Sequence, residues 1–223
     1  MLLFVSRSVL SLVQNFFRIL LYYSRMASPL LIRKIYYHMT GMMENLPAKM
    51  YFHNLQHTQD VFLVATEIAL MSAIPQQDLL VLQLAALFHD TGYFYEYKGH
   101  EDKSKAIATN FLRQENCSEN LVTAVTATIE ATKVPQNPQN DIQRIICDAD
   151  LFHLSQPDYT LYADRLRREW AVHLNKRYTD NEWYANNLAF LQQHRYFTGY
   201  GQEILESGKQ RNIKELEQWL AAS

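Results

Sequence analysis

The stretch ALFHD, residues 86–90, closes an apolar run of helical spacing with an imidazole next to a carboxylate. Neighbouring residues of a helix point about 100° apart, so His89 and Asp90 can reach one common point only in a crevice beside the helix. A divalent metal ion would occupy such a point. The pair therefore predicts a metal site at the end of a helix.

Two further candidate ligands lie far from this pair in the chain. His57 stands in YFHNLQHTQDV, residues 51–61, and Asp150 stands in ICDADLFHL, residues 146–154. Together with His89 and Asp90 they offer two nitrogen and two oxygen donors. That mixture suits manganese, zinc, iron, magnesium or cobalt, and it is too rich in nitrogen for a dedicated calcium site.

Four segments of the chain resemble the HD superfamily of metal-dependent phosphohydrolases. YFHNLQH is similar to the Y-H-N-x-x-H segment of cyclic-nucleotide phosphodiesterases, and HDTGY followed by GHEDKS resembles a bacterial HD pattern. CDADLFHL resembles the segment that supplies the last aspartate of the H…HD…D ligand set. The resemblance covers roughly residues 30–200. It implies that Asp150 binds the metal, while Asp148 has a supporting or capping role.

The resemblance also suggests catalytic roles. It gives His53 the role of donating a proton to the leaving oxygen, and the four-residue spacing from His57 predicts that the two share a helix face. Asp90 would bridge two metals or orient the attacking water. His100 and Glu101, at the start of the next helix, are further catalytic candidates.

A second metal ion is a more open question. In relatives with two metals, additional histidines hold the second ion, and His100 is a candidate for this role. Glu130 stands where the next histidine is expected and is the candidate replacement. The alternative is that Glu101 stabilises a helix N-terminus and that Glu130 is a solvated surface residue.

Candidate substrate-binding residues follow the HD pair. The loop TGYFYEYKG, residues 91–99, is rich in aromatic residues, and Tyr93, Tyr97 and Lys98 are expected to stack on a base and contact a phosphate. Among three arginines on a later charged helix, Arg167 is a candidate for holding a phosphate. The alternatives are a packed surface loop and a solvated charged face.

Composition and periodicity predict one all-α domain. The chain has 223 residues with 21 basic and 23 acidic side chains, so it lacks the excess of positive charge expected of a general nucleic-acid-binding protein. Its two cysteines do not form a disulfide framework. Apolar residues recur at helical spacing, which favours eight or nine helices in a single HD-domain/PDEase-like bundle over residues 26–223. Helices are expected at 28–45, 53–72, 75–90, 100–114, 118–132, 141–154, from 156 onward and at 202–221.

Residues 1–25 differ from the rest of the chain because they are apolar and aromatic, with three arginines and no acid. Arg7 and Arg18 interrupt the run, which argues against a clean transmembrane helix. Three interpretations remain open: a membrane-surface helix, a packing helix, or translated upstream sequence with the natural start at Met26. The expected location is the cytoplasm, with peripheral membrane association through residues 1–25 under the first interpretation.

Taken together, the motifs predict a metal-dependent phosphohydrolase that uses metal-activated water to cleave a phosphoester of a small molecule, such as a nucleotide or cyclic nucleotide. Two alternatives are an HD-type di-iron oxygenase and a non-catalytic nucleotide-binding protein. Neither the substrate, nor the choice between monoester and diester, nor the metal, nor the oligomeric state follows from the sequence.

Overall fold

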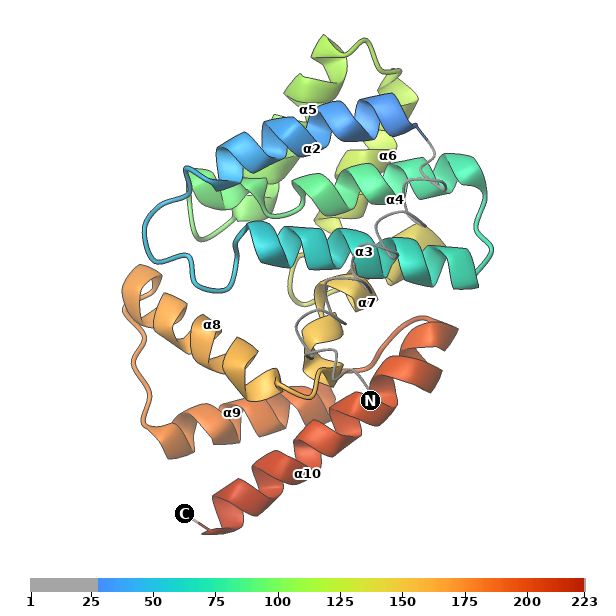
Figure 1. Cartoon of the computed structure of the whole chain (residues 1–223). Helices are drawn as coiled ribbons and strands as arrows, with labels where there is room; N and C mark the ends of the chain where they lie inside the picture. The colour runs from blue at the N-terminus through green and yellow to red at the C-terminus, as the bar shows by residue number, and fades with distance from the viewer. Residues whose placement is uncertain (1–27, 223) are drawn as a thin grey trace, which may run out of the picture.

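The computed structural model describes residues 28–222, and over this part of the chain it contains nine α-helices and no strand. This confirms the all-α prediction (Figure 1). The α-helices are α2 (Pro29–Met43), α3 (Leu55–Met71), α4 (Gln76–Phe88), α5 (His100–Gln114), α6 (Glu119–Glu130), α7 (Asp141–Asp150), α8 (Tyr159–His173), α9 (Asp180–Gln193) and α10 (Glu206–Ala222).

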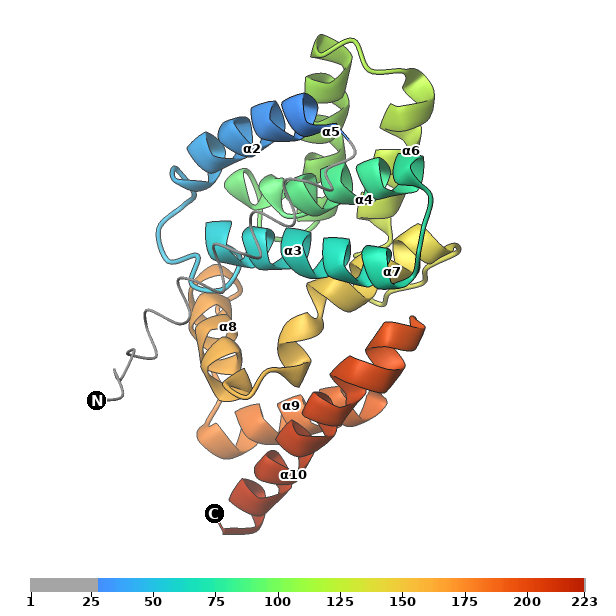
Figure 2. The same ribbon diagram turned by 45° about the vertical axis from the view of Figure 1, so that its right-hand side comes forward.

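The helices divide between two hydrophobic clusters. Helices α2 to α7 enclose the larger cluster, whose centre includes the fully buried side chains of Ile35, Leu82, Phe88 and Ile129. Helices α8, α9 and α10 pack around a smaller cluster that contains Trp183, in the lower half of the molecule (Figures 1 and 2). Burial of large apolar side chains, at about 1.5–3 kcal/mol each, is the main stabilising contribution in both clusters.

Local capping explains where several helices begin. The Asn54 side chain accepts hydrogen bonds from the backbone N–H groups of Gln56 and His57, so α3 starts at Leu55 and not at His53 as the sequence suggested. The range 100–114 is confirmed by α5. Helix α9 had not been placed from the sequence, although Thr179 and Glu182 form a capping box at its start.

The helix expected at 141–154 is shorter than predicted. Helix α7 ends at Asp150, and the chain continues as the short 3-10 helix η2 (Phe152–Ser155). The closing helix has a π-helical turn, η3 (Gly201–Leu205), ahead of α10. Because α7 ends at Asp150, this residue lies at a helix end, where its side chain can turn toward α3.

Asp148 connects the two parts of the molecule. Its fully buried carboxylate accepts hydrogen bonds from the backbone N–H groups of Phe197 and Thr198 and from the Thr198 hydroxyl, at 2.6–2.9 Å. All three donors lie just ahead of η3. Asp148 therefore holds the start of the closing helical segment, which corresponds to the capping role expected for it, and these hydrogen bonds involve no predicted metal ligand.

Gly92 permits a close backbone contact between two segments that carry candidate site residues. It lies in the 3-10 helix η1 (Thr91–Phe94), directly after the HD pair. A Cβ atom at this position would lie 1.8 Å from the backbone oxygen of His100. No side-chain rotation can relieve this overlap, because the contacted atom belongs to the backbone.

We expect Gly92→Ala to lower the free energy of unfolding by about 1–3 kcal/mol, the usual cost of forcing extra volume into a packed site. Urea denaturation would measure the effect. Gly41→Ala is a matched control, because a Cβ there has no atom within 4 Å. Equal stability of the two variants would contradict the close approach.

No helix within residues 28–222 combines the length and the hydropathy needed to cross a membrane. Residues 1–25, with the three interpretations given for them, lie outside the described residues. The domain boundary predicted at residue 26 also stays a prediction, since the described chain begins after it.

Candidate metal centre

Three chain segments bring the four predicted ligands together. His57 lies in the first turn of α3, His89 is the C-cap of α4, Asp90 follows it, and Asp150 is the last residue of α7. Helices α3, α4 and α7 are mutual neighbours in the larger cluster (Figure 1). The ligand set H…HD…D, spread over 93 positions of sequence, thus becomes one site.

The donor atoms are close enough to share one ion. One donor atom from each of His57, His89 and Asp90 lies within 4.8 Å of the other two. Asp90 Oδ2 lies 3.4 Å from His57 Nε2 and 3.2 Å from His89 Nε2. A metal ion at about 2.0–2.2 Å from each donor requires donor separations of about this size.

Asp150 contacts the same two imidazoles. Its Oδ1 lies 3.2 Å from His57 Nε2 and 3.4 Å from His89 Nε2. Each imidazole nitrogen is therefore flanked by one oxygen of Asp90 and one of Asp150. The side chain of Asp150 is 18% exposed and that of Asp90 4%. Solvent therefore reaches the cluster from the Asp150 side.

Contacts around the cluster prepare His89 for metal binding. His89 Nδ1 lies 2.9 Å from the backbone oxygen of Ala86 and donates to it, which leaves Nε2 as a lone-pair donor. His89 Nε2 and Asp90 Oδ2 are both buried and make no well-formed hydrogen bond among the described residues. The two atoms lie 3.2 Å apart without a well-aligned hydrogen bond, and a metal ion bound by both would satisfy them.

The electrostatics of the cluster agree with a cation site. Burial alone would lower the pKa of His89, but the neighbouring Asp90 and Asp150 carboxylates raise it well above its ordinary value. Burial alone would likewise raise the pKa of Asp90, and His89 and His100 hold it well below the usual range. The two carboxylates thus favour positive charge at this point, and a divalent ion would displace the imidazole protons on binding.

His53 lies next to the site, but from the loop before α3 and not from the helix as predicted. The four-residue spacing predicted that His53 and His57 share a helix face. His53 instead precedes the N-cap Asn54 and lies outside the helix, so this prediction was wrong. The two rings are still close, with centroids 5.8 Å apart. His53 Nε2 lies 3.2 Å from the Tyr93 hydroxyl, so one ring nitrogen faces the site and the other points away from it.

Glu169 on α8 holds the other nitrogen of His53. Its fully buried carboxylate hydrogen-bonds to His53 Nδ1. It also accepts hydrogen bonds from the backbone N–H groups of Phe52 and His53, with N···O distances of 2.8 and 3.2 Å. The Tyr97 hydroxyl donates to the same carboxylate at 2.8 Å. Burial alone would lower the pKa of His53, but the hydrogen bond to Glu169 and the nearby carboxylates raise it.

Sequence reasoning had missed Glu169. It stands in LRREW, residues 166–170, within a charged stretch that was interpreted as a solvated face apart from one inward arginine. The only available signal was its position three residues after Leu166 and next to Trp170, two residues that pack in the smaller cluster, where a carboxylate is unusual. Its partner could not be found without the tertiary structure.

His100 lies beside the other oxygen of Asp90. His100 Nε2 is 3.4 Å from Asp90 Oδ1, whereas Asp90 Oδ2 faces His57 and His89. Asp90 is therefore positioned to bridge two points of positive charge. Glu101 is buried, and its Oε2 lies 3.6 Å from His100 Nδ1, so it contacts His100 and not the ligand cluster.

Three predicted site residues do not have the expected surroundings. Glu130 is exposed and forms ion pairs with Lys105 and Lys133, so it is a solvated surface residue and not a replacement ligand. The Arg167 guanidinium donates to Asp180 and to the backbone oxygen of Tyr178, which ties it to the start of α9.

The third correction concerns Tyr93. Its ring stacks on the imidazoles of His53 and His100, with centroid distances of 4.3 and 3.8 Å, and only 7% of the residue is exposed. Little ring surface is left for a base to stack on. Tyr97 is half-buried and lies parallel to the His173 ring, and Lys98 is exposed.

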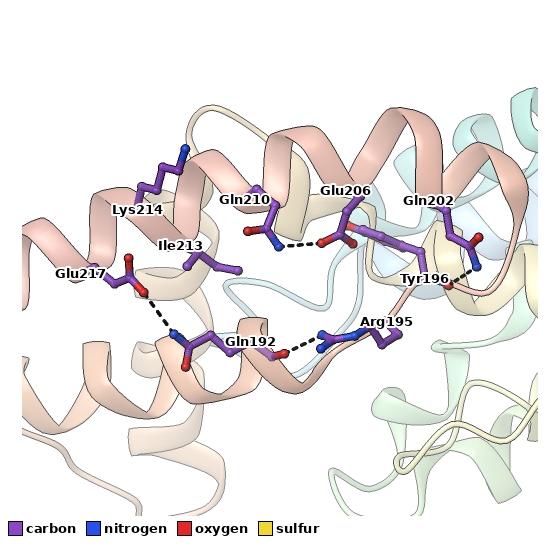
Figure 3. A pocket seen from close by; sticks show the side chains of 9 residues that line it. All are labelled: Gln192, Arg195, Tyr196, Gln202, Glu206, Gln210, Ile213, Lys214 and Glu217. Atoms are coloured by element: carbon purple, nitrogen blue, oxygen red, sulfur yellow. Dashed lines mark hydrogen bonds between the residues drawn. The ribbon is translucent and has the colours of Figure 1, made fainter.

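Two other features do not contribute to the cluster. The buried Cys147 thiol lies 3.1 Å from the backbone oxygen of Ala131, and burial raises its pKa, which disfavours the thiolate that binds metals. A groove of about 780 Å³ between α9 and α10 contains none of the predicted site residues. Its polar side chains hydrogen-bond within the protein, for example Gln210 to Glu206 (Figure 3).

Comparison with known proteins agrees with this geometry. Residues 54–155 match the family model described as the HD domain. Residues 54–155 of this chain are an HD domain. The matched segment contains His57, the His89-Asp90 pair and Asp150, but it ends before Glu169.

A solved HD structure has the same fold. It is described as a predicted HD superfamily hydrolase from an uncultured Thermotogales bacterium, and it is similar to this chain with a TM-score of 0.58 at 17% sequence identity. The similarity covers 85% of this chain and 91% of that one, so the HD-type helical arrangement extends beyond the matched family segment. No curated protein is significantly similar to the chain.

Proposed function

We propose that this HD protein is a metal-dependent phosphohydrolase that cleaves a phosphoester of a small molecule, with nucleotides as the first class of substrate to test. One observation carries the proposal: donor atoms of His57, His89 and Asp90 lie within 4.8 Å of one another, and Asp150 Oδ1 lies 3.2 and 3.4 Å from the two imidazoles. Within this group His89 Nε2 and Asp90 Oδ2 are buried without well-formed hydrogen bonds. The HD domain and the hydrolase description of the similar bacterial protein support it.

In this proposal His57, His89, Asp90 and Asp150 hold a divalent metal ion. When bound, such an ion lowers the pKa of a water molecule and polarises phosphoryl oxygens. The side chains around it prepare the other half of the reaction. His53, whose pKa the hydrogen bond to Glu169 raises, would donate a proton to the leaving oxygen, and Tyr93 hydrogen-bonds to the ring nitrogen that would do so.

The site also has the beginning of a second metal position. Asp90 Oδ1 and His100 Nε2 face each other at 3.4 Å, while Glu130 is committed to surface ion pairs. A second ion would therefore have fewer protein ligands than the first and would be held more weakly. We propose one firmly bound ion for each chain and a second that depends on metal concentration.

Metal analysis of natively purified protein followed by a phosphoester panel tests the function. We expect about one transition-metal ion per chain and hydrolysis of at least one class among nucleoside monophosphates, cyclic nucleotides and aryl phosphates. Two irons per chain with a coupled di-iron spectrum would instead favour an oxygenase. Nucleotide binding without turnover over several metals would favour a non-catalytic binding protein.

A further inference from the structure

The hydroxyl group of Tyr93 is hydrogen-bonded to the ring nitrogen of His53 that faces the site. The buried Glu169 carboxylate holds Nδ1 of His53, which leaves Nε2 as the nitrogen from which a proton can go to a substrate. The Tyr93 hydroxyl lies 3.2 Å from this Nε2. Because a ring nitrogen of histidine has one N–H or one lone pair, its hydrogen-bonding position is already taken by Tyr93.

Tyr93 is packed too closely to move aside for a leaving group. Its ring contacts the imidazoles of His53 and His100, with centroid distances of 4.3 and 3.8 Å, and 7% of the residue is exposed. Its backbone belongs to η1, where the Gly92 N–H donates to the buried Ser104 hydroxyl at 2.8 Å. Packed interiors leave little free volume for such a movement. A leaving oxygen therefore meets the Tyr93 hydroxyl and not the imidazole behind it.

The same tyrosine also joins the proposed acid to the metal cluster. The His100 ring on which it stacks has its Nε2 3.4 Å from Asp90 Oδ1. Through His53, the hydroxyl of Tyr93 is also next to a ring that lies 5.8 Å from the ring of His57. The hydroxyl is thus placed beside the ligands that would hold the phosphoryl group, on the side of the acid.

We infer that Tyr93 is a catalytic residue whose hydroxyl passes the proton of His53 to the leaving oxygen. A phenol hydroxyl can do this because it donates one hydrogen bond while it accepts another. The inference rests on the proposed function, which makes His53 the source of the proton. It changes the group that touches the substrate from an imidazole to a phenol.

The relay conserves protons and electrons. When the bond between phosphorus and the leaving oxygen breaks, its electron pair stays on that oxygen. The oxygen takes the hydroxyl proton of Tyr93, and Tyr93 takes the Nε2 proton of His53. His53 is left neutral, with its Nδ1 proton still in the hydrogen bond to Glu169. Solvent returns a proton to His53 after the product leaves.

Tyr93→Phe tests the relay, because it removes one oxygen atom and keeps the ring that packs against His53 and His100. We expect kcat for phenyl esters to fall by about 10²-fold, the lower end of what general acid catalysis typically contributes. We expect a much smaller loss for 4-nitrophenyl esters, whose leaving group needs little protonation. Esters of phosphate serve for a monoesterase and esters of thymidine 5′-phosphate for a diesterase. The metal content per chain should equal that of the wild type.

A double variant shows whether the two residues act in series. If the proton passes from His53 through Tyr93, removal of either residue stops the same step. The combined variant His53→Gln, Tyr93→Phe should then be no slower on phenyl esters than the slower single variant. Two residues that act independently would instead give losses that multiply.

Tyr95→Phe is the matched control, because Tyr95 follows in the same loop and is 65% exposed. We expect it to keep the wild-type ratio of the two esters. Equal losses of Tyr93→Phe on both esters, faster cleavage of phenyl esters, or multiplied losses in the double variant would overturn the inference alone. A metal-loaded wild type that hydrolyses none of these esters would overturn the proposed function, and the inference with it.

Discussion

Asp90→Ala protein is expected to lose its bound metal and at least about 10³-fold of its phosphoester hydrolysis. Asp90 provides one oxygen to the pair His57 and His89 and its other oxygen to His100, at 3.2–3.4 Å. Its removal deletes a ligand of the first ion and the bridge to the second position. The loss corresponds to several kcal/mol of transition-state charge stabilisation, the contribution expected of a catalytic metal ion.

Metal content per chain, measured by elemental analysis beside the wild type, is the primary readout. Asp102→Ala is the matched control, because Asp102 is 59% exposed and pairs with Lys105 and Lys133 on the surface. This control is expected to keep both metal and activity. If Asp90→Ala retained the full metal content and activity, the proposed metal centre would be wrong.

Glu169→Gln protein is expected to lose about 10- to 100-fold in kcat for substrates with poor leaving groups. Glutamine keeps the shape of the side chain but removes the negative charge that raises the pKa of His53 and orients its ring. General acid catalysis contributes typically 10²–10⁴-fold, and a misaligned, more easily deprotonated imidazole keeps only part of it. The loss is expected to be much smaller for 4-nitrophenyl phosphate, whose leaving group needs little protonation.

The pH profile gives a second readout with a defined sign. His53 acts as an acid only while it is protonated, so activity falls as the pH rises through its pKa. The Glu169 carboxylate raises that pKa, and therefore the fall should occur at lower pH in Glu169→Gln. Circular dichroism would verify the fold of the variant. An identical pH profile, together with equal losses on both substrates, would show that Glu169 has only a structural role.

The proposed ligands could be predicted because each stands in a short segment with a recognisable pattern. His89-Asp90 ends an apolar helical run, and the other two ligands stand in short recognisable segments. Their convergence needed the packing of α3 and α7 against α4, which is apolar and buried on nearly every side. The helix at 100–114 was also predicted correctly.

The surroundings of His53 could not be predicted, because they depend on a contact across 116 positions of sequence. The capping of α3 by Asn54 moved His53 off the helix, and Glu169 on α8 then fixed its ring. Arg167 and Arg168 are adjacent in sequence and were indistinguishable there. Only the packed helix showed that one pairs with Asp180 while the other lies on Tyr51.

The sequence by itself determined the fold class and the four candidate ligands of the proposed metal centre, since helical periodicity and ligand chemistry are properties of short segments. Tertiary structure decided the partners of these residues: the carboxylate behind His53, the oxygen of Asp90 that faces His100, and the surface position of Glu130. The physical reason is that a hydrogen bond or ion pair requires a separation of a few ångströms. Between segments distant in sequence, that separation is set by how the helices pack.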